Sequence, residues 1–311
     1  MISIPRDFDI YIVLPAISNK MPAVVRLSDS ISLASFHNAE DVPGGYHGGL
    51  MSFLNKFELN KTYIRLRVNG YIGRLESVCL KRALNDLKII LQHGMFRQLF
   101  KRTPAEKARL GLLNALALPQ TRPTIVSVDD ARSKPAVKTI DLPNDMSRFL
   151  SNLDINWDND QIRTAVEAND LPSAIHSSFT RSAQLIGCQE EEADRIKSAV
   201  KWCFDSYITE NETLSFLQIC IGLEALLGDD DYKGSLTELL ADRYAYLIGD
   251  DIRGRKTIKE RFKRLYDIRS KLVHGSVLEL DHDQSAYLGW GRNILEYSIL
   301  KEIKHLKIGQ S

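Results

Sequence analysis

Residues 214–227, LSFLQICIGLEALL, constrain the fold of this chain more than any other segment. Read as an α-helix, the segment has apolar residues on every face, and Glu224 is its only charge. A helix without a polar face must be covered on all sides, so the segment predicts the buried central helix of a bundle. Because an unpaired buried carboxylate is costly, we expect Glu224 to be protonated, hydrogen-bonded, paired with a cation, or at the wall of a wet cleft.

The C-terminal part of the chain carries the helices that could cover this segment. Apolar residues recur at helical spacing at about 189–209, 211–227, 234–248, 255–274 and 283–307. The connections between these segments are short, which favours antiparallel packed helices. We therefore predict an all-α helical bundle at residues 176–308.

The first half of the chain has a different pattern. Short β-rich runs separated by Pro, Gly and Asn occupy residues 8 to about 68, and residues 75–100 show the spacing of one amphipathic helix. Two further strand-like runs, TIVSV and AVKTIDL, precede a helix expected at residues 145–153. The pattern predicts an α+β domain at residues 1–155, followed by a polar, weakly patterned linker at residues 156–175.

Charge and cysteine use exclude several classes of protein. The chain has 41 Lys and Arg against 40 Asp and Glu, so any affinity for nucleic acid must come from local patches. The four cysteines have neither the close pairs of a zinc site nor the density of a secreted disulfide scaffold. The N-terminus lacks the pattern of a signal peptide, and the uncharged apolar runs are too short to span a bilayer. We expect a cytoplasmic protein that does not contact a membrane and uses no metal or cofactor.

A second charge falls where an apolar residue is expected. Taking about 100° per residue, Arg269 lies within about 20° of Ile258. It therefore sits on the core stripe of the helix at residues 255–274, whose apolar members are Ile258, Phe262, Leu265, Ile268 and Leu272. A guanidinium at such a position needs an anion, which could be Glu224, a substrate phosphate, or first one and then the other.

His274 follows five residues later, at the expected end of the same helix. On a regular helix Arg269 and His274 would diverge by about 140°. Gly275 is the usual residue for a helix C′ position, which places His274 in the final turn, where the chain can leave the helix axis. An imidazole at such a position is suited to serve as an acid or base near neutral pH.

The same helix is locally basic. Residues 251–275 contain nine Lys or Arg against three acids, an excess of six. We expect these side chains to bind an RNA phosphate backbone and to lead one phosphate to Arg269 and His274. The candidate RNA-binding residues are Arg255, Lys259, Lys263 and Arg264.

The runs ICIGLEALLG, ADRYAYLIG and RLYDIRSKLVHG together resemble the ApeA-like branch of the HEPN superfamily. The resemblance covers about residues 190–304, and Arg269 and His274 match its signature of Arg, four to six residues, and His. Members often carry Asn, Asp or His directly after the arginine, where this chain has Ser270. The candidate catalytic residues are therefore Arg269 and His274, with Glu224, Ser270, Asp267 and Lys271 as supporting residues.

The resemblance implies a homodimeric, metal-independent ribonuclease with the two sites in one cleft. His274 would take the proton of the RNA 2′-OH or protonate the 5′-oxygen, and Arg269 would stabilise the phosphorane. The products would carry 2′,3′-cyclic phosphate and 5′-OH ends. Many relatives are anti-phage defence effectors or toxins, so the N-terminal domain would be a sensor or adaptor for a phage-derived trigger. The alternative is a non-catalytic HEPN bundle that serves in binding or assembly.

Overall fold

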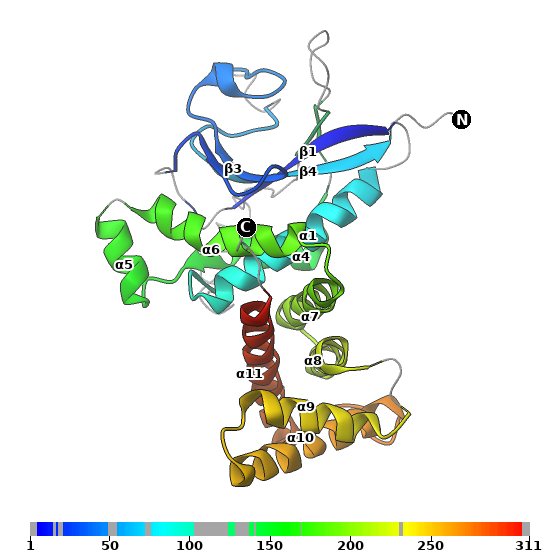
Figure 1. The fold of residues 1–311 in the computed structure, drawn as a ribbon. Helices are drawn as coiled ribbons and strands as arrows, with labels where there is room; N and C mark the ends of the chain where they lie inside the picture. Colours follow the sequence, from blue (N-terminus) through cyan, green and yellow to red (C-terminus); the bar gives the residue numbers. More distant parts are fainter. Residues whose placement is uncertain are drawn as a thin grey trace. The chain divides into compact units, whose positions relative to one another are not determined.

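The computed structural model describes residues 5–14, 17, 21–48, 55–71, 76–102, 124–127, 137–139, 141–168, 170–229 and 233–306. The chain divides into two compact units, Met1–Ala183 and Gln184–Ser311, here called the N-terminal unit and the helical unit. The first contains a sheet with helices, and the second is all-helical (Figure 1). The predicted fold class, an α+β region followed by a helical bundle, is confirmed.

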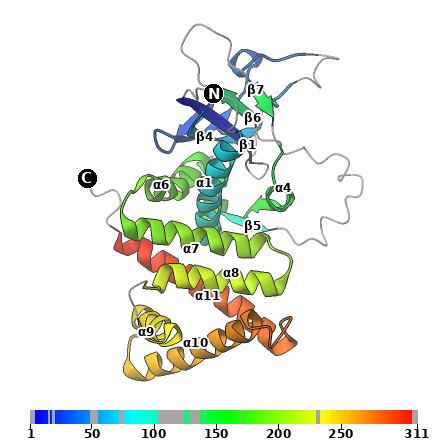
Figure 2. The ribbon, with the colours of Figure 1, turned by 90° about the vertical axis from the view of Figure 1, so that its right-hand side faces the viewer.

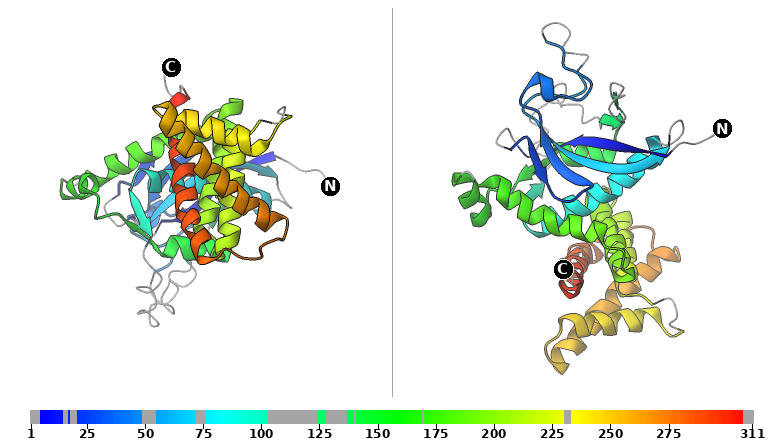
Figure 3. Two further views of the ribbon diagram at one scale, coloured as in Figure 1. Left: turned by 90° about the horizontal axis from the view of Figure 1, so that it is seen from below. Right: turned by 45° about the horizontal axis from the view of Figure 1, so that its top comes forward.

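The N-terminal unit is built on an antiparallel sheet. The described strands run in the order β2 (Val24–Arg26), β3 (Ile31–Ser35), β4 (Thr62–Tyr71), β1 (Pro5–Val13), β6 (Thr124–Ser127) and β7 (Val137–Thr139). The two longest strands, β1 and β4, lie side by side (Figure 3). Tyr11 is opposite Arg65, and Asp9 is opposite Arg67. Side chains alternate across the sheet, so Ile10 and Ile12 are fully buried on one face while Tyr11 and Val13 point to the other.

Each face of the sheet has an apolar layer. The helix α1 (Glu76–Phe96) packs against β1 and β4. Tyr11, Phe36, Phe57 and Tyr63 form an aromatic cluster on the face that carries Tyr11, with ring centroids 5.0–5.9 Å apart. A second, two-stranded sheet joins β5 (Phe100–Arg102) to β8 (Leu153–Ile155), and the helix α4 (Asn144–Ser151) precedes β8. Leu153, expected in that helix, therefore begins a strand instead.

Residues 156–175, expected as a linker, are largely helical. They contain α5 (Asp160–Glu167) and the beginning of α6 (Leu171–Gly187), and the division between the two units falls inside α6. The side chain of Asn159 accepts a hydrogen bond from the Gln161 N–H at 3.0 Å and so caps α5. This helix is short and mostly polar, with Ile162 buried, so it has almost no apolar periodicity to detect.

The helical unit consists of α7 (Glu191–Ile208), α8 (Glu212–Leu227), α9 (Leu236–Ile248), α10 (Ile252–Val273) and α11 (His282–His305) in the described residues. These bounds agree closely with the helices expected there, although the predicted domain end at residue 308 lies outside the described residues. Figure 2 shows α7 and α8 side by side, with α11 beside them and α9 and α10 below. The helix α8 contacts all four others.

The central position of α8 is confirmed. Phe216, Ile219, Cys220 and Leu223 have no exposed surface. A Cβ on Gly222 would lie 2.7 Å from Leu295 Cδ2, so the glycine lets α11 approach α8 closely. Among the residues described, no helix is both long enough and apolar enough to cross a membrane.

Candidate functional site

Arg269 and Glu224 face each other from neighbouring helices of the helical unit. Arg269 Nη2 lies 3.2 Å from Glu224 Oε1, and the two side chains are 29% and 23% exposed. Of the alternatives open for Glu224, the structure shows pairing with a cation, together with one long hydrogen bond from the same side chain. The pair is neither fully buried nor fully solvated, so solvent and ligands can reach it in part.

The hydrogen bonding of this pair is loose. Arg269 Nη2 donates to Glu224 Oε2 at 3.5 Å, the long limit of a hydrogen bond, and Oε1 is buried without a hydrogen-bond partner among the described residues. A guanidinium has five N–H donors, of which this contact uses one. Arg269 therefore retains donors that a second anion could use.

Burial dominates the electrostatics of Glu224. Desolvation raises the pKa of its carboxyl, and the neighbouring Arg269 only partly offsets this. The apolar side of the pair includes the buried thiol of Cys220 and the ring of Tyr266, whose hydroxyl donates to the Cys220 carbonyl at 3.3 Å. Tyr266 in turn stacks on Phe262 with ring centroids 5.1 Å apart.

His274 is the C-cap residue of α10, as the sequence predicts. Gly275 has φ +70°, and its N–H donates to the Leu272 carbonyl at 3.2 Å. The Ser276 N–H donates to the Lys271 carbonyl at 2.9 Å, which completes a Schellman motif. The His274 side chain is exposed and lies in the negative field of the helix end. Its imidazole is therefore open to solvent and to a ligand.

The three remaining supporting candidates lie on the outer side of α10. Lys271 Nζ pairs with Asp267 Oδ2 at 2.7 Å, and both side chains are at least half exposed. Ser270 is exposed as well. The described residues show no ion pair or side-chain hydrogen bond from these three to Arg269, Glu224 or the His274 imidazole. The structure therefore brings the predicted residues together as two separate pairs, Arg269 with Glu224 and Lys271 with Asp267.

Most of the predicted RNA-binding residues hold α10 to α9. Lys259 Nζ lies 3.0 Å from Glu238 Oε2 and 2.6 Å from Asp242 Oδ1, and Lys263 pairs with Glu238. Arg255 donates to the Gly249 carbonyl at 2.9 Å. Arg264 is exposed, with no partner in the described part of the chain. The local charge count overstated the free positive charge, because the neutralising acids come from α9.

A second polar network, which the sequence reasoning missed, joins α7, α8 and α11. Arg292 Nη2 donates to the Ser206 carbonyl and to Ser215 Oγ, both at 2.7 Å. One turn further along α11, Glu296 accepts a hydrogen bond from the Tyr207 hydroxyl, and burial raises the pKa of this carboxyl. The signal in the sequence was an Arg and a Glu four residues apart in a largely apolar helix.

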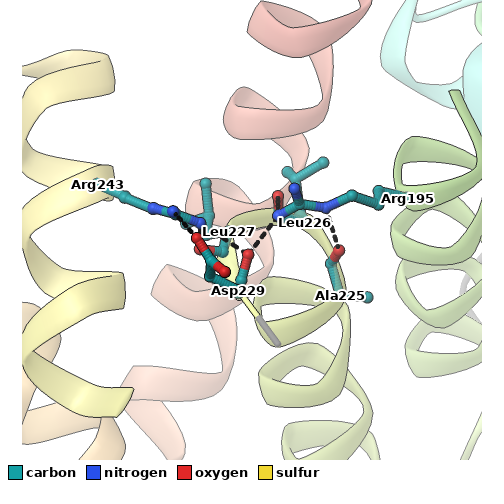
Figure 4. Close-up of polar contacts among 7 residues, drawn as sticks. Arg195, Ala225, Leu226, Leu227, Asp229 and Arg243 are labelled. Atoms are coloured by element: carbon teal, nitrogen blue, oxygen red, sulfur yellow. Dashed lines mark hydrogen bonds and ion pairs between the residues drawn. The ribbon is translucent and has the colours of Figure 1, made fainter. Parts of the chain in front are cut away.

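Two arginines converge on the C-terminal end of α8 (Figure 4). Arg195 of α7 donates to the Leu226 carbonyl at 3.0 Å, and Arg243 of α9 donates to the Leu227 carbonyl at 2.9 Å. Cavities of about 380 and 840 Å³ adjoin this end of α8, and both are lined in part by Arg195 and Leu226. Neither cavity is lined by Arg269 or His274.

The chain offers neither a metal site in its described residues nor a similarity to known proteins. Within the described ranges, no group of three or more His, Cys, Asp or Glu side chains is arranged to hold a metal ion. Comparison of the chain with known protein families, with curated proteins and with solved structures finds no match.

Proposed function

We propose that this chain is a metal-independent endoribonuclease of the HEPN type, with Arg269 and His274 as its catalytic residues. The observation that carries the proposal is the loose, partly exposed contact of Arg269 with Glu224. A guanidinium on the apolar stripe of a helix, held by one long hydrogen bond, is ready to bind a phosphate. The exposed imidazole at the end of the same helix supplies a group for proton transfer.

The reaction that fits these groups is transesterification within RNA. The 2′-oxygen attacks the adjacent phosphorus, the bond from phosphorus to the 5′-oxygen breaks, and a 2′,3′-cyclic phosphate forms. A base must remove the 2′-OH proton, and an acid must supply a proton to the departing 5′-oxygen. His274 performs one of these transfers, while Arg269 stabilises the negative charge that develops on the phosphorane.

Two proton transfers favour a site with two imidazoles. A homodimer that brings the His274 side chains of two protomers to one scissile phosphate would supply both the base and the acid. Glu224 acts as a positioning residue, because its carboxylate orients Arg269 until a phosphate competes for the same N–H donors. The N-terminal unit would then be the sensor or adaptor, with a phage-derived trigger, in a cytoplasmic defence protein.

The deciding experiment analyses the ends of cleaved RNA. Wild type, Arg269→Ala and His274→Ala are purified and incubated with RNA in EDTA, and His282→Ala serves as a matched control, since His282 is also exposed at a helix end of this unit. We expect 2′,3′-cyclic phosphate and 5′-OH ends from wild type and the control, and a loss of about 100-fold or more in both site variants. Equal cleavage by all four proteins would exclude this site.

One observation favours a second candidate function, a non-catalytic binding or assembly bundle. Three of the four predicted RNA-binding residues are occupied by contacts within α9 and α10. In that case Arg269→Ala and His274→Ala would leave the cellular activity of the chain intact. Measuring toxicity or phage resistance of the same variants in cells therefore separates the two candidates.

A further inference from the structure

One face of the N-terminal sheet gathers arginines on neighbouring strands. Strand pairing places Arg26 of β2 opposite Ser32 of β3, Ser32 opposite Arg65 of β4, and Arg65 opposite Tyr11 of β1. Residues that are directly opposite share a face, with Cβ atoms about 5 Å apart. Arg67, two residues after Arg65 on the same strand, lies on this face as well.

A single buried carboxylate serves two of these arginines. Arg67 Nε and Nη2 donate to the two oxygens of Asp9 at 2.9 and 3.0 Å, which is a bidentate contact. Arg65 Nε lies 3.2 Å from Asp9 Oδ2. Asp7, one row further along β1, is exposed. Three guanidinium groups against these two carboxylates leave the face with a net positive charge.

The hydrogen-bonding capacity of Arg65 is not filled. Each oxygen of Asp9 accepts one hydrogen bond from Arg67. Arg65 Nε lies within ion-pair distance of Asp9 but is a buried atom without a hydrogen bond, and Arg65 donates no hydrogen bond within the described residues. The side chain of Arg65 is 24% exposed, so its terminal nitrogens can be reached from solvent.

Ser32, beside Arg65, is 4% exposed, and its hydroxyl also lacks a partner in the described part of the chain. Arg26, at the edge of the sheet, is exposed. Buried donors without partners are uncommon and mark places where an ion or a water completes the structure.

We propose that this face of the sheet binds the oxyanion of a small phosphate-bearing molecule. Arg65 supplies the central pair of donors, Arg26 and Arg67 flank the anion, and the hydroxyl of Ser32 turns toward it by rotation about χ1. Asp9 pairs with Arg67 and lies beside Arg65, so its negative charge competes with the bound oxyanion. This binding site is independent of the ribonuclease proposal and gives the N-terminal unit a class of ligand.

The test measures binding of inorganic phosphate to the full chain by titration calorimetry, with chloride maintaining constant ionic strength. We expect binding to wild type and at least tenfold weaker binding to Arg65→Gln. Arg148→Gln is the matched control, since Arg148 lies in the same unit and pairs with Asp145 on the surface of α4. Absence of phosphate binding to wild type, or equal binding to wild type and Arg65→Gln, would overturn the proposal.

Three further variants, with one control, keep the test decisive if Arg65→Gln does not fold. Arg26→Gln, at an exposed edge position, should fold and bind phosphate severalfold more weakly. Asp9→Asn should bind phosphate more tightly, because it removes the competing carboxylate; a purely structural ion pair predicts no such gain. Ser32→Ala should weaken binding, whereas Ser35→Ala, which breaks a 3.0 Å hydrogen bond to Thr62, should destabilise the fold without changing affinity. Unchanged affinity in Arg26→Gln and Asp9→Asn would refute the site.

The source of the oxyanion is tested by competition. A nucleoside monophosphate should displace inorganic phosphate and should lose affinity in Arg65→Gln to the same extent. A short RNA without terminal phosphates should not compete. If only this RNA binds, and depends on Arg65, a small phosphate-bearing ligand is excluded.

Discussion

The contact between Glu224 and Arg269 can be measured by a double-mutant cycle. The variants are Glu224→Gln, Arg269→Gln and the double variant, which remove the charges with little change in volume. At the observed 3.2 Å, the Coulomb energy is about 5 kcal/mol at an effective dielectric constant of about 20 and about 1.3 kcal/mol in bulk water. Because both side chains are partly exposed, we expect a coupling energy of about 1–2 kcal/mol in the stabilising direction.

The pKa of Glu224 determines whether Glu224→Gln alone raises or lowers the free energy of unfolding. Burial raises the pKa of Glu224 above its ordinary value despite Arg269, so folding disfavours the charged carboxylate. Well below the ordinary pKa of glutamate, Glu224 is protonated in both the folded and the unfolded chain, and it does not reduce the free energy of unfolding. As pH rises through the raised pKa, wild type loses stability relative to Glu224→Gln. This variant should therefore be the more stable protein at neutral pH, and even more so in the Arg269→Gln background.

Urea unfolding of the four proteins, followed by helical circular dichroism from about pH 4 to pH 7, checks both expectations. Glu279→Gln is the control, because Glu279 is an exposed glutamate of the same unit. A coupling energy of zero would refute the argument for the pair. If Glu224→Gln were less stable than wild type at neutral pH, or if the difference in their free energies of unfolding did not change with pH, burial would not be the main influence on the pKa of Glu224. A more stable Glu224→Gln protein that has lost RNA cleavage would support a positioning role.

Two further predictions concern stability. Burial lowers the pKa of His93 from 6.5 to about 4, so the stability that the neutral imidazole contributes is present above pH 6.5. As pH falls toward 4, the free energy of unfolding of wild type should decrease by up to about 3 kcal/mol relative to that of His93→Leu. Free energies of unfolding that change in parallel with pH in the two proteins would contradict this. Gly275→Ala should destabilise the chain by about 1 kcal/mol because of the positive φ, whereas Gly289→Ala, at an exposed helical position with open space, should stabilise it by about 0.5–1 kcal/mol. Thermal unfolding of both alanine variants measures the difference, and equal effects would refute it.

The sequence predicts the helices of the helical unit better than it predicts the partners of the charged residues on their surface. A helix that is apolar on every face must be covered on all sides, so the central position of α8 follows directly from its sequence. Arg269 was found because a charge breaks an apolar stripe, and the end of α10 because Gly275 tolerates a left-handed conformation. Each of these features is encoded within about one helix length of sequence.

Interactions between distant segments account for what the sequence did not predict. Lys259 and Lys263 are neutralised by Glu238 and Asp242, which lie on the preceding helix and enter no local charge count. The arginines on the sheet face come together only through strand pairing, since Arg26 and Arg65 are far apart in sequence. The helix α5 is held by a cap and an Asp160–Arg163 pair rather than by an apolar stripe.

The two arginines at the end of α8 have a consequence for local unfolding. Arg195 and Arg243 hydrogen-bond the last carbonyls of α8 from α7 and α9, and both contact the Gly228 carbonyl. Fraying of α8 would break contacts to both neighbours, and opening of either neighbour would expose carbonyl groups that α8 cannot satisfy itself. The three helices should therefore behave as one cooperative unit in native-state hydrogen exchange, with the amides near the end of α8 protected as well as those at its centre.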